Sequence, residues 1–369
     1  MRIGILTLPL HTNYGGILQA YALQTVLERM GHEVKVINKI FNYNLPLWKQ
    51  PFVYTKRILK NLKGDKFPIF YEQQVIKEIP IIRRYTNEFI GKYIHTHDVK
   101  RYSDLKENDF DAFVVGSDQV WRPKYFGKIE DAYLQFTKDW NIKRIAYAVS
   151  FGTDEWEYSS KQTANCKNLV KKFDAVSVRE DSGVDLCKRY LDIDSEHLLD
   201  PTMLLKKEDY IRLFENSNTP ASPGTLMCYI LDETPEIELL INKIARERGL
   251  IPFRASSKVE NNRAPLVERI QPSVEQWLRG FYDAKFIVTD SFHACVFSIL
   301  FNKPFIAIGN KGRGLSRFIS LLSRFSLEDR LLLNLSNEYH LNEIDWYQIN
   351  IGITKEIVFS KKFLFDNFN

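Results

Sequence analysis

Side chains that could carry acid–base chemistry follow short apolar runs in this 369-residue sequence. His293 comes after the run 286–288, with Asp290 and Ser291 between them, and the glycine-rich basic loop 310–314 comes later. An imidazole titrates near neutral pH and can act as a general acid or base. A histidine near a helix start is usually structural, but these polar neighbours at the end of an apolar run favour a functional one. We therefore predict that His293 is catalytic.

Asp118 and Arg179 each follow an apolar run in the first half of the sequence. Asp118 either caps a helix or activates a substrate hydroxyl, and Trp121 is placed to stack on a sugar ring. Arg179 either binds a phosphate or carboxylate through two hydrogen bonds or forms a salt bridge with Glu180 or Asp181.

The amino-terminal segment Thr12–Gly16 contains a pair of glycines. Asn13 can cap the next helix, and Gly15 and Gly16 would let a ligand approach free backbone N–H groups, which suits an anion or a sugar hydroxyl. The same residues could instead form only a tight turn between a strand and a helix. No GxGxxG or GxxxxGK[ST] motif occurs, which weighs against dinucleotide or P-loop chemistry.

The candidate site residues can act together only if the strands that precede them end at the same edge of a sheet. The apolar runs are short, as is typical of parallel strands buried on both faces, and segments with helical periodicity separate them. The predicted strands are 2–8, 33–38, 111–116, 144–150, 174–179, 225–231, 250–254, 285–290 and 304–309. Repeated strand–helix units predict mostly parallel sheets with helices on both faces, and ligands bind such sheets outside the carboxyl ends of their strands.

Length and a polar linker divide the chain into two predicted domains. At roughly 100–200 residues per domain, this length favours two or three domains. Residues 206–224 become rich in Ser, Asn and Pro, which marks the boundary. We predict an α/β protein with two Rossmann-like domains, 1–210 and 220–369, that face each other across a cleft. The last helix is expected to pack back on the first domain.

Composition excludes several classes of protein. The sequence has 51 basic and 46 acidic residues, and a net charge of +5 is too small to indicate a nucleic-acid partner. The 4 cysteines form no CxxC pair and no ligand pattern with histidine, so we expect neither disulfides nor a metal site. Reduced cysteines also lead us to expect a cytoplasmic protein. No apolar run is long enough to span a bilayer. Aromatic residues make up 13% of the chain, which suits either a dense core or a carbohydrate-binding cleft.

The segment Lys49–Lys66 concentrates positive charge. It is rich in lysine, with apolar residues between the lysines and Asp65 as its acidic residue. This pattern predicts either a solvated helix face or a contact with an anionic membrane surface or a phosphorylated substrate. A membrane contact would be peripheral, at the inner face of the membrane.

Taken together, the motifs resemble those of the polysaccharide pyruvyl transferase family. The resemblance covers most of the chain and rests on GILTLPLHTNYGGILQAYALQ, VVGSDQVW, AVSFG, SVRED, LLDPT, TDSFHA and the strand that begins at Pro304. Each motif alone is weak, but their order and spacing are specific to the family and less so to any substrate within it.

The resemblance implies a glycosyltransferase-B-like pair of Rossmann domains with an activity in exopolysaccharide or capsular polysaccharide biosynthesis. Such an enzyme moves the pyruvyl group of phosphoenolpyruvate onto a sugar of a polysaccharide precursor, usually as a pyruvate ketal. Phosphoenolpyruvate is a co-substrate, and no other cofactor is implied. The acceptor, lipid-linked or free, would bind on the side of the first domain and the donor on the side of the second. The rival hypothesis is a glycosyltransferase of the same fold with a nucleotide-sugar donor.

The resemblance also implies roles at matching positions. His293 matches the family's proposed acid, and Arg179 matches a strand-end arginine that holds the donor. The family has a basic residue two positions before the histidine, where this sequence has Ser291. Ser291 is expected to bind the donor at this position, and Lys311 or Arg313 is expected to supply the missing charge. The remaining predicted site residues are Asp118, as the hydroxyl-activating base, and the acceptor-binding residues Asn13, Tyr14, Gly15, Gly16, Ser117, Gln119 and Trp121.

Overall fold

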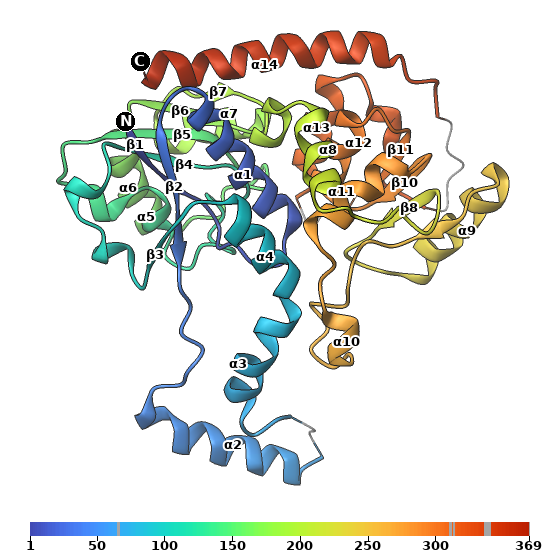
Figure 1. Ribbon diagram of the computed structural model, residues 1–369. Helices are drawn as coiled ribbons and strands as arrows, with labels where there is room; N and C mark the ends of the chain where they lie inside the picture. Colours follow the sequence, from blue (N-terminus) through green and yellow to red (C-terminus); the bar gives the residue numbers. More distant parts are fainter. Residues whose placement is uncertain (65–66, 310–311, 313, 336–340, 369) are drawn as a thin grey trace.

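The first half of the chain forms a seven-stranded sheet (Figure 1). The computed structural model describes residues 1–64, 67–309, 312, 314–335 and 341–368. The strand order is β3-β2-β1-β4-β5-β6-β7, and all neighbours run parallel. The strands are β1 (Arg2–Leu6), β2 (Glu33–Lys39), β3 (Thr96–Val99), β4 (Ala112–Val115), β5 (Lys143–Val149), β6 (Ala175–Val178) and β7 (Glu196–His197).

A second, five-stranded parallel sheet follows in the order β12-β11-β10-β8-β9. Its strands are β8 (Leu226–Tyr229), β9 (Pro252–Phe253), β10 (Phe286–Thr289), β11 (Phe305–Ile308) and β12 (Leu331–Leu332). The predicted α/β fold with two Rossmann-like units is therefore confirmed. The strand predicted at 250–254 is shorter than expected, and β3, β7 and β12 were not predicted.

Helices separate the strands and cover the sheets. They are α1 (Tyr14–Arg29), α5 (Ile129–Ala132), α6 (Ser160–Val170), α7 (Asp181–Leu186), α8 (Lys207–Asn216), α9 (Pro235–Arg248), α10 (Leu266–Arg269), α11 (Val274–Asp283), α12 (Phe292–Leu300), α13 (Leu315–Arg324) and α14 (Trp346–Phe368). Successive strand residues point to opposite faces, so Val114 packs with α1 in one core whereas Phe113 and Val115 pack with α6 in another. Burial on both faces explains why the strands read as apolar runs.

One apolar core continues from the first sheet to the second. Tyr14, at the start of α1, stacks on Trp277 of α11 with ring centroids 5.2 Å apart. Its hydroxyl donates a hydrogen bond to the carbonyl of Pro272 at 2.7 Å. Both rings are fully buried. At this point the two halves of the chain are in packed contact.

The last helix, α14, extends from the second sheet back across the first (Figure 1). The Ser360 hydroxyl oxygen accepts a hydrogen bond from the backbone N–H of Leu199 at 3.2 Å. The rings of Phe363 and Tyr147 have centroids 6.2 Å apart, so α14 also covers apolar side chains of β5. The carboxyl end of the chain therefore contributes to the packing of the amino-terminal sheet.

Three helices lie between β2 and β3; the first two form an arm that projects away from both sheets, whereas the third lies beside α1 (Figure 1). They are α2 (Gln50–Leu62), α3 (Tyr71–Ile82) and α4 (Arg84–Tyr93). The sequence predicted only a basic helix in this region. Within the described residues, no helix is both long and apolar enough to cross a membrane.

Candidate active site

Arg179 lies at the centre of a buried cluster where strands of the first sheet end. It follows β6, and its Nη1 donates to Asp200 Oδ2 at 2.7 Å and to Ser117 Oγ at 3.3 Å. Ser117 follows β4 and donates its hydroxyl to the same carboxylate oxygen at 2.9 Å. All three side chains are buried. The structure thus brings together two predicted site residues around a carboxylate that was not predicted.

Asp200 is held in its ionised form by its neighbours. Its Oδ1 accepts hydrogen bonds from the backbone N–H and the hydroxyl of Thr202, at 3.0 and 2.7 Å. Burial alone would raise the pKa of Asp200, but the charges and hydrogen bonds of His293, Arg179 and Thr202 outweigh burial and lower it. A carboxylate with a strongly favoured charge can stabilise a cation beside it.

His293 is the cation-forming side chain beside Asp200. It lies in the first turn of α12, after β10, and is 6% exposed. Its Nε2 lies 3.5 Å from Asp200 Oδ2, which is an ion-pair contact and too long for a strong hydrogen bond. His293, which belongs to the second half of the chain, therefore lies against the strand ends of the first sheet.

Gly15 makes room for the imidazole of His293. A Cβ atom at Gly15 would lie 2.0 Å from His293 Nδ1, closer than any side chain permits. Gly15 was predicted to expose backbone N–H groups to a ligand, whereas here it allows the first turn of α1 to approach His293. The neighbouring Gly16 is less restricted, since a Cβ there would find its nearest atoms at 3.6 Å.

Several buried polar atoms of this cluster have no hydrogen-bond partner in the described part of the chain. They include Nε and Nη2 of Arg179 and Nε2 of His293. Arg179 Nη2 lies 3.7 Å from Asp118 Oδ1, and Arg179 Nε lies 3.8 Å from Glu180 Oε1, so both contacts are ionic only. Unpaired buried donors are rare in folded proteins, and here they are gathered where a bound anion could accept from them.

Arg317 of α13 adds a second guanidinium that the sequence did not predict. Its Cζ lies 5.4 Å from the centre of the Phe292 ring, and Arg179 Cζ lies 4.4 Å from the same centre. Burial, with a further contribution from the charge of Arg179, lowers the pKa of Arg317 to about 10. Two buried guanidinium groups around one ring favour binding of an anion.

Glu180 differs from Asp200 in its preferred charge. The hydroxyl of Ser150, which follows β5, donates a hydrogen bond to its Oε1. Burial raises the pKa of Glu180 despite the opposing charges of Arg179 and Arg317. The predicted salt bridge between Arg179 and Glu180 is present only as the 3.8 Å contact, and the short ion pair of Arg179 is with Asp200.

Asp118 sits in a turn after β4 and caps no helix. Its φ of 69° lies in the left-handed region, which is unusual for a residue with a side chain and often occurs at functional sites. Its carbonyl accepts from the N–H groups of Val120 and Ser150, which holds the turn against β5. Its carboxylate faces Arg179 and lies 3.6 Å from the position of a Cβ on Gly16. Asp118 therefore borders the cluster.

Most of the predicted sugar-binding side chains have other contacts. Asn13 accepts a hydrogen bond from the Gly16 N–H at 3.2 Å and caps α1. Gln119 Oε1 accepts from Arg122 Nη1 at 3.1 Å. Trp121 is fully buried and stacks on Tyr133 at 4.4 Å. The buried rings of Tyr14 and Trp121 leave no face for a sugar, so stacking on these two residues does not fit the structure.

Of the residues predicted to bind the donor in the second half of the chain, the structure describes only Ser291. Ser291 precedes α12 and is 9% exposed, and its side chain does not cap that helix. Asp290 accepts from the backbone N–H groups of Leu231 and Asp232, so it fixes the loop after β8. Lys311 and Arg313, which were expected to replace the missing basic residue, lie outside the described residues.

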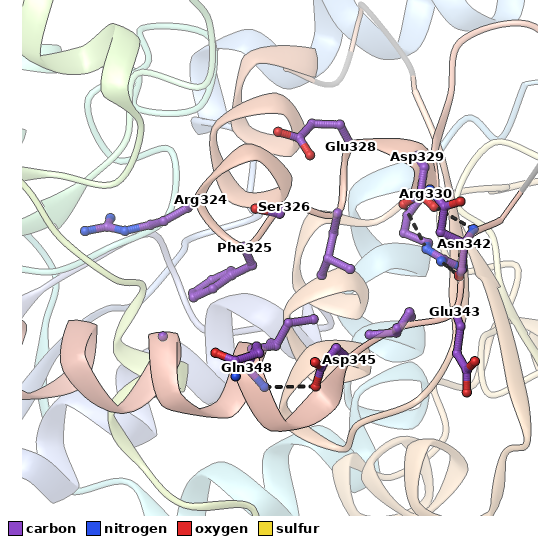
Figure 2. A pocket seen from close by; sticks show the side chains of 14 residues that line it. Arg324, Phe325, Ser326, Glu328, Asp329, Arg330, Asn342, Glu343, Asp345 and Gln348 are labelled. Carbon is purple, nitrogen blue, oxygen red and sulfur yellow. Dashed lines mark hydrogen bonds and ion pairs between the residues drawn. The ribbon is translucent and has the colours of Figure 1, made fainter.

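The cavity in Figure 2 lies apart from this cluster. It has a volume of about 420 Å³ and lies between the end of α13 and the start of α14. Its lining includes Glu328, Asp329, Glu343 and Asp345 but no predicted site residue. Among the described residues, no group of His, Cys, Asp and Glu is arranged to hold a metal ion.

The fold and the cluster define an α/β protein whose candidate site brings two buried arginines and a buried histidine together at the strand ends of the first sheet. The chain belongs to the polysaccharide pyruvyl transferase family, whose model matches residues 13–312. This match confirms the resemblance and includes every described member of the cluster except Arg317. No curated protein matches the chain.

Solved structures are similar over nearly the whole chain, at low identity. The UDP-GlcNAc 2-epimerase from Neisseria meningitidis bound to UDP-GlcNAc is 10% identical, with 98% of this chain and 93% of that chain covered and a TM-score of 0.46. The ADP-heptose LPS heptosyltransferase II of E. coli is 11% identical, with 98% and 100% covered and a TM-score of 0.39. MurG of Acinetobacter baumannii is 10% identical, with 98% and 94% covered and a TM-score of 0.39.

Proposed function

We propose that this protein is a pyruvyl transferase that moves the pyruvyl group of phosphoenolpyruvate onto a sugar of a polysaccharide precursor and forms a pyruvate ketal. The observation that carries the proposal is the pairing of unbonded Arg179 donors with an unbonded His293 nitrogen in one buried cluster. An anionic donor that also needs a proton would satisfy both groups. Membership of the family supports the transferase class.

The two guanidinium groups are the donor-binding residues in this proposal. Phosphoenolpyruvate carries a phosphate and a carboxylate, and arginine binds both through paired hydrogen bonds. Arg179 would offer its Nε and Nη2, which bond to nothing in the described chain. Arg317 would supply the second cation, in place of the basic residue that is absent at Ser291.

The charge of the cluster favours an anion if Glu180 is protonated. The raised pKa of Glu180 favours its neutral form, and the lowered pKa of Asp200 favours its charged form. Arg179, Arg317 and a protonated His293 would then outnumber the carboxylates of Asp118 and Asp200. A buried excess of positive charge stabilises a bound anion.

His293 is the proposed acid. Its imidazolium would give a proton to the methylene carbon of phosphoenolpyruvate, which converts the enol double bond into an oxocarbenium-like centre at C2. Asp200, at 3.5 Å, would stabilise the charged imidazole before transfer and is therefore a positioning residue. The remaining site donors hold the phosphate and carboxylate during this step.

Two hydroxyls of one sugar then complete the ketal. The first hydroxyl oxygen bonds to C2 and gives its proton to a base, for which Asp118 is the proposed residue. The second hydroxyl oxygen bonds to C2 as the bond from C2 to the phosphate oxygen breaks, and its proton leaves with the phosphate. The products are the pyruvate ketal and inorganic phosphate, so no cofactor is consumed.

Replacement of the proposed acid tests this function. His293→Asn should lower the turnover of phosphoenolpyruvate with saccharide acceptors by about 10²–10⁴-fold, because general acid catalysis contributes that much. Its dissociation constant for phosphoenolpyruvate should rise far less than turnover falls, because Arg179 and Arg317 remain to bind the donor. Phosphate release measures turnover, and calorimetry measures donor binding. His95→Asn is the matched control, since His95 also contacts a carboxylate, Glu28 at 2.8 Å, but is exposed.

A thermal shift measurement distinguishes pyruvyl transfer from the rival function, glycosyl transfer from a nucleotide-sugar donor. Thermal stabilisation by nucleoside diphosphates but not by phosphoenolpyruvate would contradict pyruvyl transfer and support a glycosyltransferase. Unchanged turnover in His293→Asn would contradict the acid assignment alone.

A further inference from the structure

The arm carries an exposed apolar ridge on α2 and the short turn before it. The ridge residues are Trp48, Phe52, Leu59 and Leu62, which are 69%, 75%, 56% and 79% exposed. Their spacing of four, seven and three residues places them on one face of a helix. No residue of α2 is buried. Isolated exposed apolar residues are common, but a continuous ridge of large side chains indicates a binding surface.

The opposite face of α2 is fixed to the rest of the arm. Arg57 forms an ion pair with Glu72 of α3 at 2.6 Å and donates to the carbonyl of Ile69 at 2.8 Å. Asn61 exchanges hydrogen bonds with the backbone of Phe67. These contacts set the rotation of α2 about its axis, so the apolar ridge faces outward as a consequence of folding.

Lysines flank the ridge on one side. Lys49, Lys56, Lys60 and Lys63 lie beside the apolar residues on the helical projection, and residues 47–64 contain no acidic residue. Lys56 and Lys60 form no ion pair within the described residues. They also line a cavity of about 800 Å³ between α2, α3 and the segment 262–269, to which Arg263 adds a further cation. This surface is therefore both apolar and positively charged.

We propose that α2 docks the protein on a membrane surface that contains anionic lipids. A helix with one apolar face and a lysine-rich flank lies in the plane of the interface, where apolar side chains enter the acyl boundary and lysines contact headgroup phosphates. The charge complementarity favours anionic lipid over a second copy of this chain, whose identical lysines would repel. The projection of the arm in Figure 1 leaves α2 accessible to a flat surface. The proposal is independent of pyruvyl transfer.

Vesicle co-sedimentation tests the proposal. The full-length protein should bind phosphatidylcholine vesicles that contain phosphatidylglycerol and should bind pure phosphatidylcholine at least about tenfold more weakly, because each lysine adds to the attraction. High salt should weaken the binding. Phe52→Ser with Leu59→Ser and Leu62→Ser, and separately Lys56→Glu with Lys60→Glu and Lys63→Glu, should each reduce binding by about tenfold or more.

Matched variants on another exposed helix provide the control. Leu239→Ser with Lys243→Glu changes α9, where Leu239 is 70% exposed, and should leave vesicle binding unchanged. All variants should retain the wild-type melting temperature, because the changed side chains face solvent.

Two results would overturn the proposal. One is equal vesicle binding by the wild type and both arm variants. The other is a lipid-free dimer in light scattering that the ridge substitutions abolish, which would assign this face to self-association.

Discussion

His293 and Gly15 come from opposite halves of the chain and are in close contact. The position of the His293 imidazole therefore requires that residue 15 has no side chain. Gly15→Ala would place a Cβ atom 2.0 Å from His293 Nδ1, so the imidazole must move away from Asp200. We expect the imidazole NMR signals of His293 to shift and turnover to fall about as far as in His293→Asn.

The adjacent glycine supplies the control for this prediction. A Cβ at Gly16 meets nothing closer than 3.6 Å, so Gly16→Ala should leave the imidazole signals in place. Equal shifts in both variants would show that the effect comes from α1 as a whole and not from the contact with His293.

Arg317 is predicted to act in donor binding and less in turnover. Arg317→Gln should raise the KM for phosphoenolpyruvate by roughly 10–100-fold, the usual effect of losing hydrogen bonds to a charged group, with a smaller change in kcat. Steady-state kinetics on saccharide acceptors measures both. Arg122→Gln, which breaks a partly buried ion pair with Glu157, should lower stability without this KM effect. A fall in kcat at constant KM would contradict donor binding by Arg317.

The expectation that site residues follow the carboxyl ends of strands identified Arg179, Ser117 and His293 from sequence, because each follows a clear apolar run. It missed Asp200, since the preceding strand, β7, has only two residues and is too short to recognise. It missed Arg317 because that residue lies inside a helix and reaches the cluster only through the packing of α13. The direction in which side chains point after a turn could not be predicted from sequence either. Asp118 adopts a left-handed φ, and Trp121, three residues later, is buried instead of facing a ligand.

At the scale of elements, most strands could be predicted because burial on both faces leaves an apolar run in the sequence. β3, β7 and β12 could not, because they are short and mostly not buried. The arm could not, since helices α2 and α3 bury few side chains and so leave little apolar periodicity to recognise. The linker predicted at 206–224 also contains α8. The Ser-, Asn- and Pro-rich part of the predicted linker, 217–224, follows this helix and precedes β8.

The ion pair between α1 and α8 should make stability depend on pH. Asp209 of α8 accepts from Arg29 of α1, and these bonds, with those from Lys206 and Arg212, outweigh burial and lower the pKa of Asp209 to about 2. An unfolded aspartate has a pKa of about 3.9. The stabilisation is therefore complete above about pH 5 and is lost as the pH falls through about 2.

Urea unfolding of a variant can measure this contribution. Asp209→Asn should lower the free energy of unfolding by about 1 kcal/mol near neutral pH, because Arg29 is half exposed, and by less at about pH 3. Asp194→Asn, at an exposed ion pair with Lys188, should change it by less than about 0.5 kcal/mol. A constant difference across this pH range would contradict the ionic origin.

At the scale of the whole molecule, α14 should couple the stability of the two sheets. Phe363 is 5% exposed and packs on Tyr147 of the first sheet, so Phe363→Ala should cost about 3 kcal/mol through the cavity it leaves. Phe359→Ala, on the same helix at 47% exposure, should cost much less. Denaturant unfolding followed by fluorescence and circular dichroism measures both. Equal costs would contradict the packing of α14 on the first sheet.

The position of α14 also affects how the chain folds during synthesis. Tyr147 and Leu199 are translated long before Ser360 and Phe363, which cover them. On the ribosome the amino-terminal sheet therefore keeps an uncovered apolar face until residues 360–363 leave the exit tunnel. Such a face is a site for chaperone binding or for aggregation. Premature termination within the last helix would leave that exposure permanent, even though every residue of the candidate active site had been made.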